Sequence, residues 1–266
     1  MLTELVPPGN LQSFCLQGYN SLTFPSWMMG ITSYLPQLSY VSLKELPWCS
    51  ALPPLGQLPN LGCLVIKQMH SIREIGGDLY GGTRAFQALG QFYLEQMDNL
   101  QEWNTIGYSD EDGGNVLVLP MLRELTINQC PILRFKPCPP IGGDSWHIGN
   151  SDNAISLGGE SVHVEASFSS NVLHQCRLAL HLPALETLWI ENCSDMTSSS
   201  LDILRCLSSL ETLVKLHISN CPGIKRLPES IKQLTNLQRL NISDCPELVQ
   251  WCESDEKIMK LLRASK

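Results

Sequence analysis

A short apolar pattern that recurs along the chain constrains its fold more than any other feature. The pattern is clearest in the last copy, which consists of Leu237, Leu240, Ile242, Cys245 and Leu248. Three further copies keep all five positions: Leu122, Leu125, Ile127, Cys130 and Leu133; Leu185, Leu188, Ile190, Cys193 and Met196; and Leu213, Leu216, Ile218, Cys221 and Ile224. Looser copies begin at Leu11, Leu38, Leu61 and Leu89, with Tyr19, Leu46, Met69 and Met97 in place of the cysteine.

The spacing within each copy predicts one β-strand. The second and third apolar positions are two residues apart, so their side chains share one face of a strand. Most copies follow one another at the ~20–29 residues of a leucine-rich repeat. Parallel pairing between successive strands then stacks the apolar faces into one core that no single copy could build. We predict an α/β repeat solenoid, a leucine-rich-repeat horseshoe with a parallel concave sheet and a convex side of loops and short helices.

The quality of the pattern divides the chain into four parts. Residues 1–135 hold about four to five repeats and residues 182–252 hold three. The Gly-, Ser- and Pro-rich residues 136–181 are predicted to be a degenerate repeat or an insertion loop, with a decayed copy around Gly159, Val162 and Val164. Residues 253–266 are expected to form a capping helix through Ile258, Leu261 and Leu262, whereas the N-terminus enters the pattern without a cap, as if the array began in the middle.

The segments between the strands carry further signals. Leu201 to Leu210 has leucines at helical spacing, and Leu227 to Leu234 indicates a short helical turn. The cysteine position is expected to turn the chain inward and to bond backbone groups that leave the strand, although a thiol is a weak donor. Pro131, Pro222 and Pro246 follow that position directly and cannot extend a strand ladder.

Composition limits the classes of partner. The net charge is −8 and no basic run exists, which argues against nucleic acid and anionic membrane surfaces as partners. No window of ~18 apolar residues could span a bilayer. The eleven cysteines include no CxxC pair, and no secretory signal precedes them. Free thiols in a reducing compartment, the cytoplasm and also the nucleus, therefore fit best.

A search for catalytic motifs gives no candidate. The sequence contains no HExxH, GxSxG or GxGxxG. His174, Cys176 and His181 are close in sequence but have no third partner at metal-ligand spacing. The repeated cysteines are interpreted as turn residues. We therefore expect no enzyme, no metal site and no cofactor.

Binding is expected on the concave face, at the residues that flank the apolar strand positions. Aromatic and arginine side chains dominate protein-binding hot spots, which makes Tyr40, Tyr93 and Trp189 the leading candidates, unless they only pack on neighbouring side chains of the sheet. The full set of candidate partner-binding residues is Tyr40, Lys44, Lys67, Tyr93, Glu95, Glu124, Trp189, Glu191, Lys215, His217 and Arg239.

Several phrases resemble one family. The phrases look like the repeat region of plant nucleotide-binding leucine-rich-repeat disease-resistance proteins, and they are residues 24–28, 52–61, 69–76, 80–81, 99–103, 119–127 and 227–248. The later phrases are most similar to grass members of the coiled-coil type. The resemblance covers residues ~7–135 and ~182–252, and residues 69–71 loosely resemble a nucleotide-sensing motif of that family but lie inside a repeat.

The resemblance implies the repeat domain of an intracellular immune receptor. Such a domain recognises a pathogen effector or a guarded host protein, and it holds a nucleotide-binding domain inactive in cis or in trans. The phosphate-binding loop is absent, so no nucleotide is assigned to this chain. The alternatives are a free-standing adaptor or scaffold such as a ubiquitin-ligase substrate receptor, a truncated receptor remnant, and a secreted enzyme inhibitor.

Overall fold

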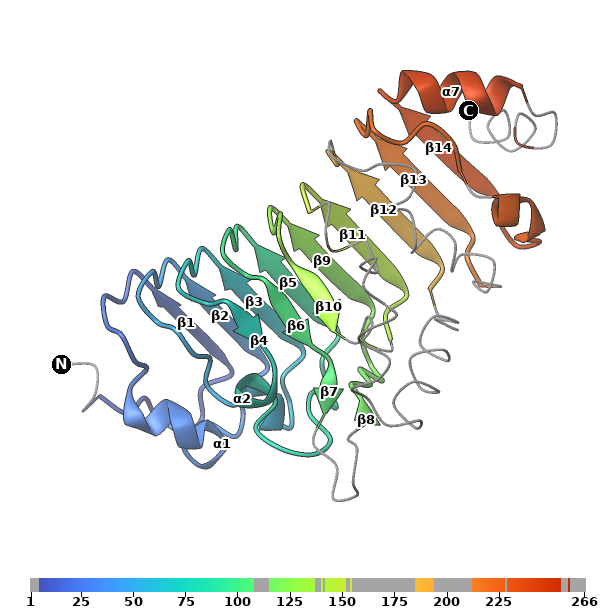
Figure 1. The fold of residues 1–266 in the computed structure, drawn as a ribbon. Coiled ribbons are helices and arrows are strands. Elements are labelled where there is room, and N and C mark those ends of the chain that lie inside the picture. The colour runs from blue at the N-terminus through green and yellow to red at the C-terminus, as the bar shows by residue number, and fades with distance from the viewer. Residues whose placement is uncertain are drawn as a thin grey trace.

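A parallel sheet of nine strands forms the body of the computed structural model (Figure 1). The structure describes residues 5–107, 115–136, 140, 142–151, 154, 185–193, 212–227, 229–254 and 258. In spatial order the strands are β1 (Ser13–Gln17), β2 (Tyr40–Lys44), β3 (Cys63–Lys67), β5 (Gln91–Glu95), β9 (Glu124–Asn128), β11 (Ser145–Gly149), β12 (Thr187–Glu191), β13 (Lys215–Ser219) and β14 (Arg239–Ser243). This arrangement confirms the leucine-rich-repeat solenoid.

The register of the sheet aligns the same repeat position from strand to strand. Leu125 pairs with Trp146, which pairs with Leu188, and Ile127 with Ile148, which pairs with Ile190. All six side chains are fully buried. Burial of apolar surface in continuous rows is the main stabilising term of such a fold, because each repeat covers the face of its neighbour.

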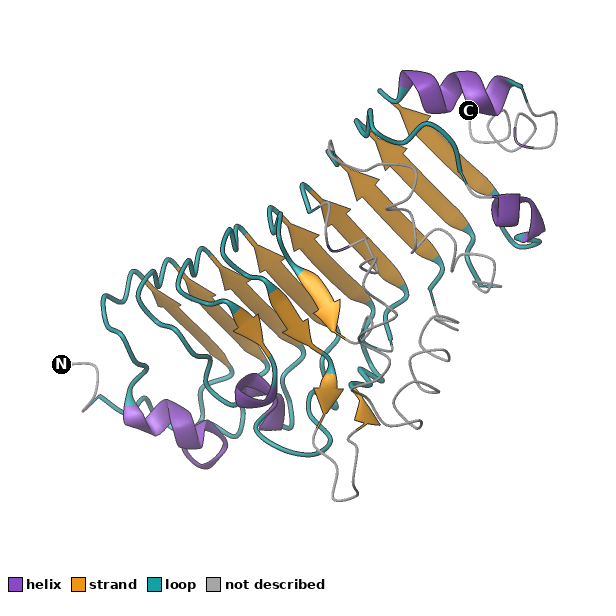
Figure 2. Cartoon of the chain, in the orientation of Figure 1, coloured by secondary structure: helices purple, strands orange, loops and turns teal. Residues whose placement is uncertain are grey.

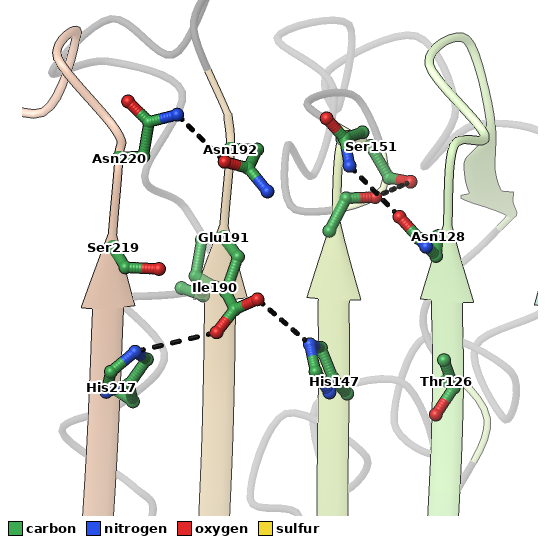
Figure 3. Close-up of polar contacts among 12 residues, drawn as sticks. Thr126, Asn128, His147, Ser151, Ile190, Glu191, Asn192, His217, Ser219 and Asn220 are labelled. Carbon is green, nitrogen blue, oxygen red and sulfur yellow. Dashed lines mark hydrogen bonds and ion pairs between the residues drawn. The ribbon is translucent and has the colours of Figure 1, made fainter.

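A left-handed residue follows every strand of this sheet. The residues are Gly18, Glu45, Gln68, Gln96, Gln129, Asn150, Asn192, Asn220 and Asp244. The backbone N–H groups of all but Asp244, which follows the last strand, continue the ladder. That of Asn192, for example, donates to Ser219 O at 3.0 Å. Asparagine side chains add to the alignment, since Asn150 donates to Asn128 at 3.0 Å and Asn220 to Asn192 at 2.8 Å (Figure 3).

The cysteine position does turn the chain as predicted. The thiol of Cys221 donates to Ser219 O at 3.1 Å, and the backbone N–H of Cys221 donates to Cys245 Sγ at 3.2 Å. In the repeat of β11, Ser151 stands at this position, where its hydroxyl donates to Gly149 O and accepts from the N–H of Cys130. These buried groups satisfy the backbone as it leaves the strand.

The other side of the solenoid carries loops, short helices and a small second sheet (Figure 2). The short helices are η2 (Ser26–Gly30), α1 (Ile31–Tyr34), η3 (Leu55–Gln57), α2 (Gly77–Tyr80) and η6 (Glu229–Gln233), the last within the segment predicted to be helical. A parallel sheet of β4 (Glu74–Ile75), β6 (Glu102–Asn104) and β10 (Arg134–Lys136) was not predicted, and neither was the antiparallel pair β7 (Ile106–Gly107) and β8 (Asn115–Val116).

Aromatic rings run between the two sheets. Phe92 lies 5.2 Å from Trp103, Trp103 lies 5.4 Å from Phe135, and Phe135 lies 6.2 Å from Trp146, measured between ring centroids. Trp103 Nε1 donates to the hydroxyl of Tyr80 at 2.9 Å, so the buried indole N–H is satisfied.

One sequence prediction needs correction. The place in the sheet between β9 and β12 belongs to β11, and not to a copy around Gly159, Val162 and Val164, which lies outside the described residues. Helix α7 (Pro246–Glu253) begins directly after Cys245, because proline fits the first turn of a helix. The cap predicted over residues 253–266 lies mostly outside the described residues. Leu248 and Cys252 of α7 are buried, and so is Ile258. The helix predicted over Leu201 to Leu210 lies outside the described residues.

Candidate functional site

The concave face presents three straight rows of side chains, because the nine strands pair residue for residue. The central row runs Cys15, Ser42, Val65, Tyr93, Thr126, His147, Trp189, His217 and Asn241. All eleven candidate residues occupy these rows. Lys215 and Arg239 are exposed and the other nine are partly buried. Ser42 is fully buried, and its hydroxyl has no hydrogen-bond partner within the described ranges, so it offers no contact.

Four candidates of the N-terminal half form two pairs of contacts. Lys67 Nζ lies 3.0 Å from Glu95 Oε2. The hydroxyl of Tyr93 donates to Glu124 Oε2 at 2.8 Å, and Gln91 donates to the same oxygen at 3.1 Å. Burial and the hydrogen bond to Glu124 raise the pKa of Tyr93. The predicted hot spot at Tyr93 thus has its polar group engaged within the sheet.

A cluster of three rings and one carboxylate lies in the C-terminal half, and we call it the Trp189 cluster. It consists of His147, Trp189, His217 and Glu191. The indole of Trp189 stacks on His147 with ring centroids 6.0 Å apart, and on its other side it lies 4.5 Å from His217. Glu191 Oε2 lies 3.4 Å from His147 Nε2, and its Oε1 lies 3.5 Å from His217 Nε2 (Figure 3). These contacts hold the indole at the sheet surface.

Sequence reasoning missed His147 because it missed strand β11. The signal was present in the alternation of Trp146 and Ile148 around it, which is the strand spacing of every other repeat. The glycine at the first position of this copy, Gly143, concealed the pattern.

Two exposed cations lie beside the Trp189 cluster. Lys215 and Arg239 are direct neighbours across β13 and β14, and each is two residues before the central row. Neither forms an ion pair with a residue that the structure describes. The cluster and the two cations together make a surface of aromatic rings with positive charge at its edge.

The chemistry of this surface suits contact with another protein. In the described parts of the chain, no three His, Cys, Asp or Glu side chains are arranged to hold a metal ion. Residues 69–71 behave as repeat residues, since Met69 is buried and exposed His70 lies 3.3 Å from Asp98. A fixed indole flanked by charged groups is typical of a protein-binding hot spot.

The fold and this surface define a leucine-rich-repeat domain, a class that generally binds proteins. A family model described as R13L1/DRL21 leucine-rich repeats matches residues 1–69. The structure is similar to the leucine-rich repeat domain of the type III effector XopL, with a TM-score of 0.53 and 16% identity over 89% of this chain and 70% of that one.

Curated relatives are plant disease-resistance proteins. The putative disease resistance protein At3g14460 of Arabidopsis thaliana is 33% identical over 141 residues, 51% of this chain and 9% of that protein. The putative RPP13-like protein 1 of the same plant is 24% identical over 85% of this chain and 22% of its own length. RGA2 of Solanum bulbocastanum is 28% identical over 50% of this chain and 14% of its own length.

These comparisons confirm the resemblance to the repeat region of plant disease-resistance proteins. The chain spans less than a quarter of the length of each of these relatives. No helix within the described residues is long and apolar enough to cross a membrane.

Proposed function

We propose that this chain is the recognition and autoinhibition domain of a plant intracellular immune receptor. In this role the concave face contacts a pathogen effector or a guarded host protein, and the domain holds a nucleotide-binding module inactive. The Trp189 cluster is the observation that carries the proposal, because its indole is positioned by His147 and His217 and remains only partly buried. Similarity to disease-resistance proteins supplies the biological setting.

The proposed role requires only surface contacts. It needs no cofactor in this chain and no catalytic group. It also implies residence in the cytoplasm or nucleus, where the receptors of this family meet their partners, and buried free thiols such as Cys130 and Cys221 are compatible with a reducing compartment.

Co-precipitation from plant cells tests the proposal. The tagged chain would be expressed with nucleotide-binding modules of related receptors, and captured proteins would be identified by mass spectrometry. Trp189→Ala should weaken capture by roughly tenfold or more, since removing a hot-spot aromatic costs about 2 kcal/mol or more.

Trp48→Ala is the matched control. Trp48 is 57% exposed and lies outside the nine-stranded sheet, so its loss should leave capture unchanged. Equal effects of the two variants, or loss of capture only in proportion to a lowered melting temperature, would count against the concave face. Capture of no nucleotide-binding module would contradict the autoinhibitory part.

A further inference from the structure

Charge is distributed unevenly along the concave face. In the N-terminal half the four charged candidates are Lys44, Lys67, Glu95 and Glu124, two of each sign. Lys67 and Glu95 form an ion pair, and Glu124 accepts two hydrogen bonds. The carboxylates of this half are therefore satisfied within the sheet.

The face of β12 to β14 carries more cations than carboxylates. Its charged residues are Glu191, Lys215 and Arg239, and Glu191 lies between the Nε2 atoms of two histidines. The two cations stay exposed and unpaired among the described residues, although the whole chain carries a net charge of −8. An acidic protein thus presents a local cationic surface next to its best-positioned aromatic ring.

Adjacent like charges are unfavourable in the isolated domain. Lys215 and Arg239 occupy directly opposite positions of paired strands, where like charges destabilise a sheet. A partner that brings carboxylates to this position would relieve the repulsion and would also gain bidentate hydrogen bonds from the guanidinium of Arg239.

We propose that the concave face of β12 to β14 docks an acidic segment of a partner protein. Carboxylates of the segment pair with Lys215 and Arg239, and an apolar or aromatic side chain of the same segment packs on Trp189. This inference rests on the proposed protein-binding function and names the chemistry of the partner. Two cations on a chain of net charge −8 suit a short acidic peptide better than the continuous phosphate backbone of a nucleic acid.

Peptide selection on the purified chain tests the inference. Short random peptides on an array would be probed with the chain at low and high salt, with oligothymidylate as a separate probe. Bound peptides should be enriched in Asp and Glu next to an aromatic or leucine residue, and binding should weaken at high salt because exposed charge pairs are screened.

Charge reversal supplies the specific variant. Lys215→Glu with Arg239→Glu should weaken binding of the selected acidic peptides by roughly tenfold or more, because like charges then face each other. Arg73→Glu with Arg134→Glu is the matched control. Both residues are exposed, lie off the concave face and change the net charge equally, so binding should stay within about twofold.

Three results would overturn the inference: selected peptides without acidic enrichment, charge-reversed protein that binds the same peptides as tightly, or preference for oligothymidylate over every peptide. Circular dichroism melting would confirm that both double variants fold. The proposed function is tested separately. If capture in plant cells depends on Trp189 but peptide binding does not respond to charge reversal, the proposed function is retained and only the acidic partner is rejected.

Discussion

At the scale of single residues, the buried thiols at the cysteine position of the repeat have a structural role. Cys130 is fully buried, and this burial raises the pKa of its thiol to about 12. The pKa of the Cys221 thiol is also raised to about 12, first by its hydrogen bond with the Cys193 thiol and then by burial. Such thiols stay protonated and are poor nucleophiles, which agrees with their interpretation as turn residues.

The raised thiol pKa values predict alkaline destabilisation. Between pH 9.0, the ordinary thiol value, and about 12, the folded chain keeps protons that the unfolded chain has lost. The free energy of unfolding therefore falls as pH rises through this window. Urea midpoints across the window measure the slope, and Cys130→Ser, which copies Ser151, should make it shallower. A slope that is flat, or unchanged in Cys130→Ser, would refute this account.

The left-handed residues after the strands differ in how well they suit that conformation. Asparagine and aspartate tolerate it better than glutamine or glutamate, because their short side chains can bond the local backbone. The last four repeats use Asn150, Asn192, Asn220 and Asp244, whereas earlier repeats use residues such as Gln129, which has φ of 55°.

Replacing Gln129 with asparagine is expected to raise the free energy of unfolding. Gln129 is exposed, so the change acts through the backbone. Gln129→Asn should stabilise the fold by about 0.5 kcal/mol, and Gln129→Val should destabilise it by about 1 kcal/mol, since a β-branched residue is strained at positive φ. Thermal melting of both variants gives the order of their stabilities. A less stable Gln129→Asn than Gln129→Val would show that the backbone at this position is not strained.

At the scale of elements, the composition of the β11 repeat explains why the sequence pattern did not predict this strand. Its five positions are Gly143, Trp146, Ile148, Ser151 and Ala154, all buried. The indole of Trp146 occupies the space that leucine fills at the first position elsewhere, because Nε1 lies against Gly143, only 2.6 Å from where a Cβ atom would be. The same Nε1 donates to Gly142 O at 3.1 Å. The small Gly143 and the large Trp146 together conserve side-chain volume. A pattern that treats each position alone does not detect such an exchange.

This exchange of volume predicts that Gly143 cannot be replaced. A Cβ atom at Gly143 would lie 2.6 Å from Trp146 Nε1, and the residue has φ of +98°. Gly143→Ala should therefore cost about 2–3 kcal/mol through steric overlap and backbone strain.

Gly18→Ala is the control for backbone strain alone. Gly18 has φ of +67°, and a Cβ atom there meets nothing within 4 Å, so its loss should cost only about 1 kcal/mol. Chemical unfolding of the two variants separates steric overlap from strain. Equal costs would mean that Trp146 moves aside.

At the scale of the whole molecule, the sequence determined the repeat architecture. Eight of the nine strands, and the outward side chain of each candidate residue, follow from the two-residue spacing of the apolar positions. That spacing is decisive because a one-residue shift would expose every buried side chain of a strand. The candidates were therefore placed correctly on one face, and their role in binding stays a prediction.

Tertiary structure alone decided which of these candidates have their polar groups engaged by neighbours. Tyr93 and Trp189 occupy the same central row, yet the hydroxyl of Tyr93 is engaged by Glu124 while Trp189 is flanked by His147 and His217. His147 became visible only when β11 took its place beside β12. These contacts join residues 28 to 42 positions apart. Side-chain pairing between strands depends on register and on which strands are neighbours, which local sequence does not encode.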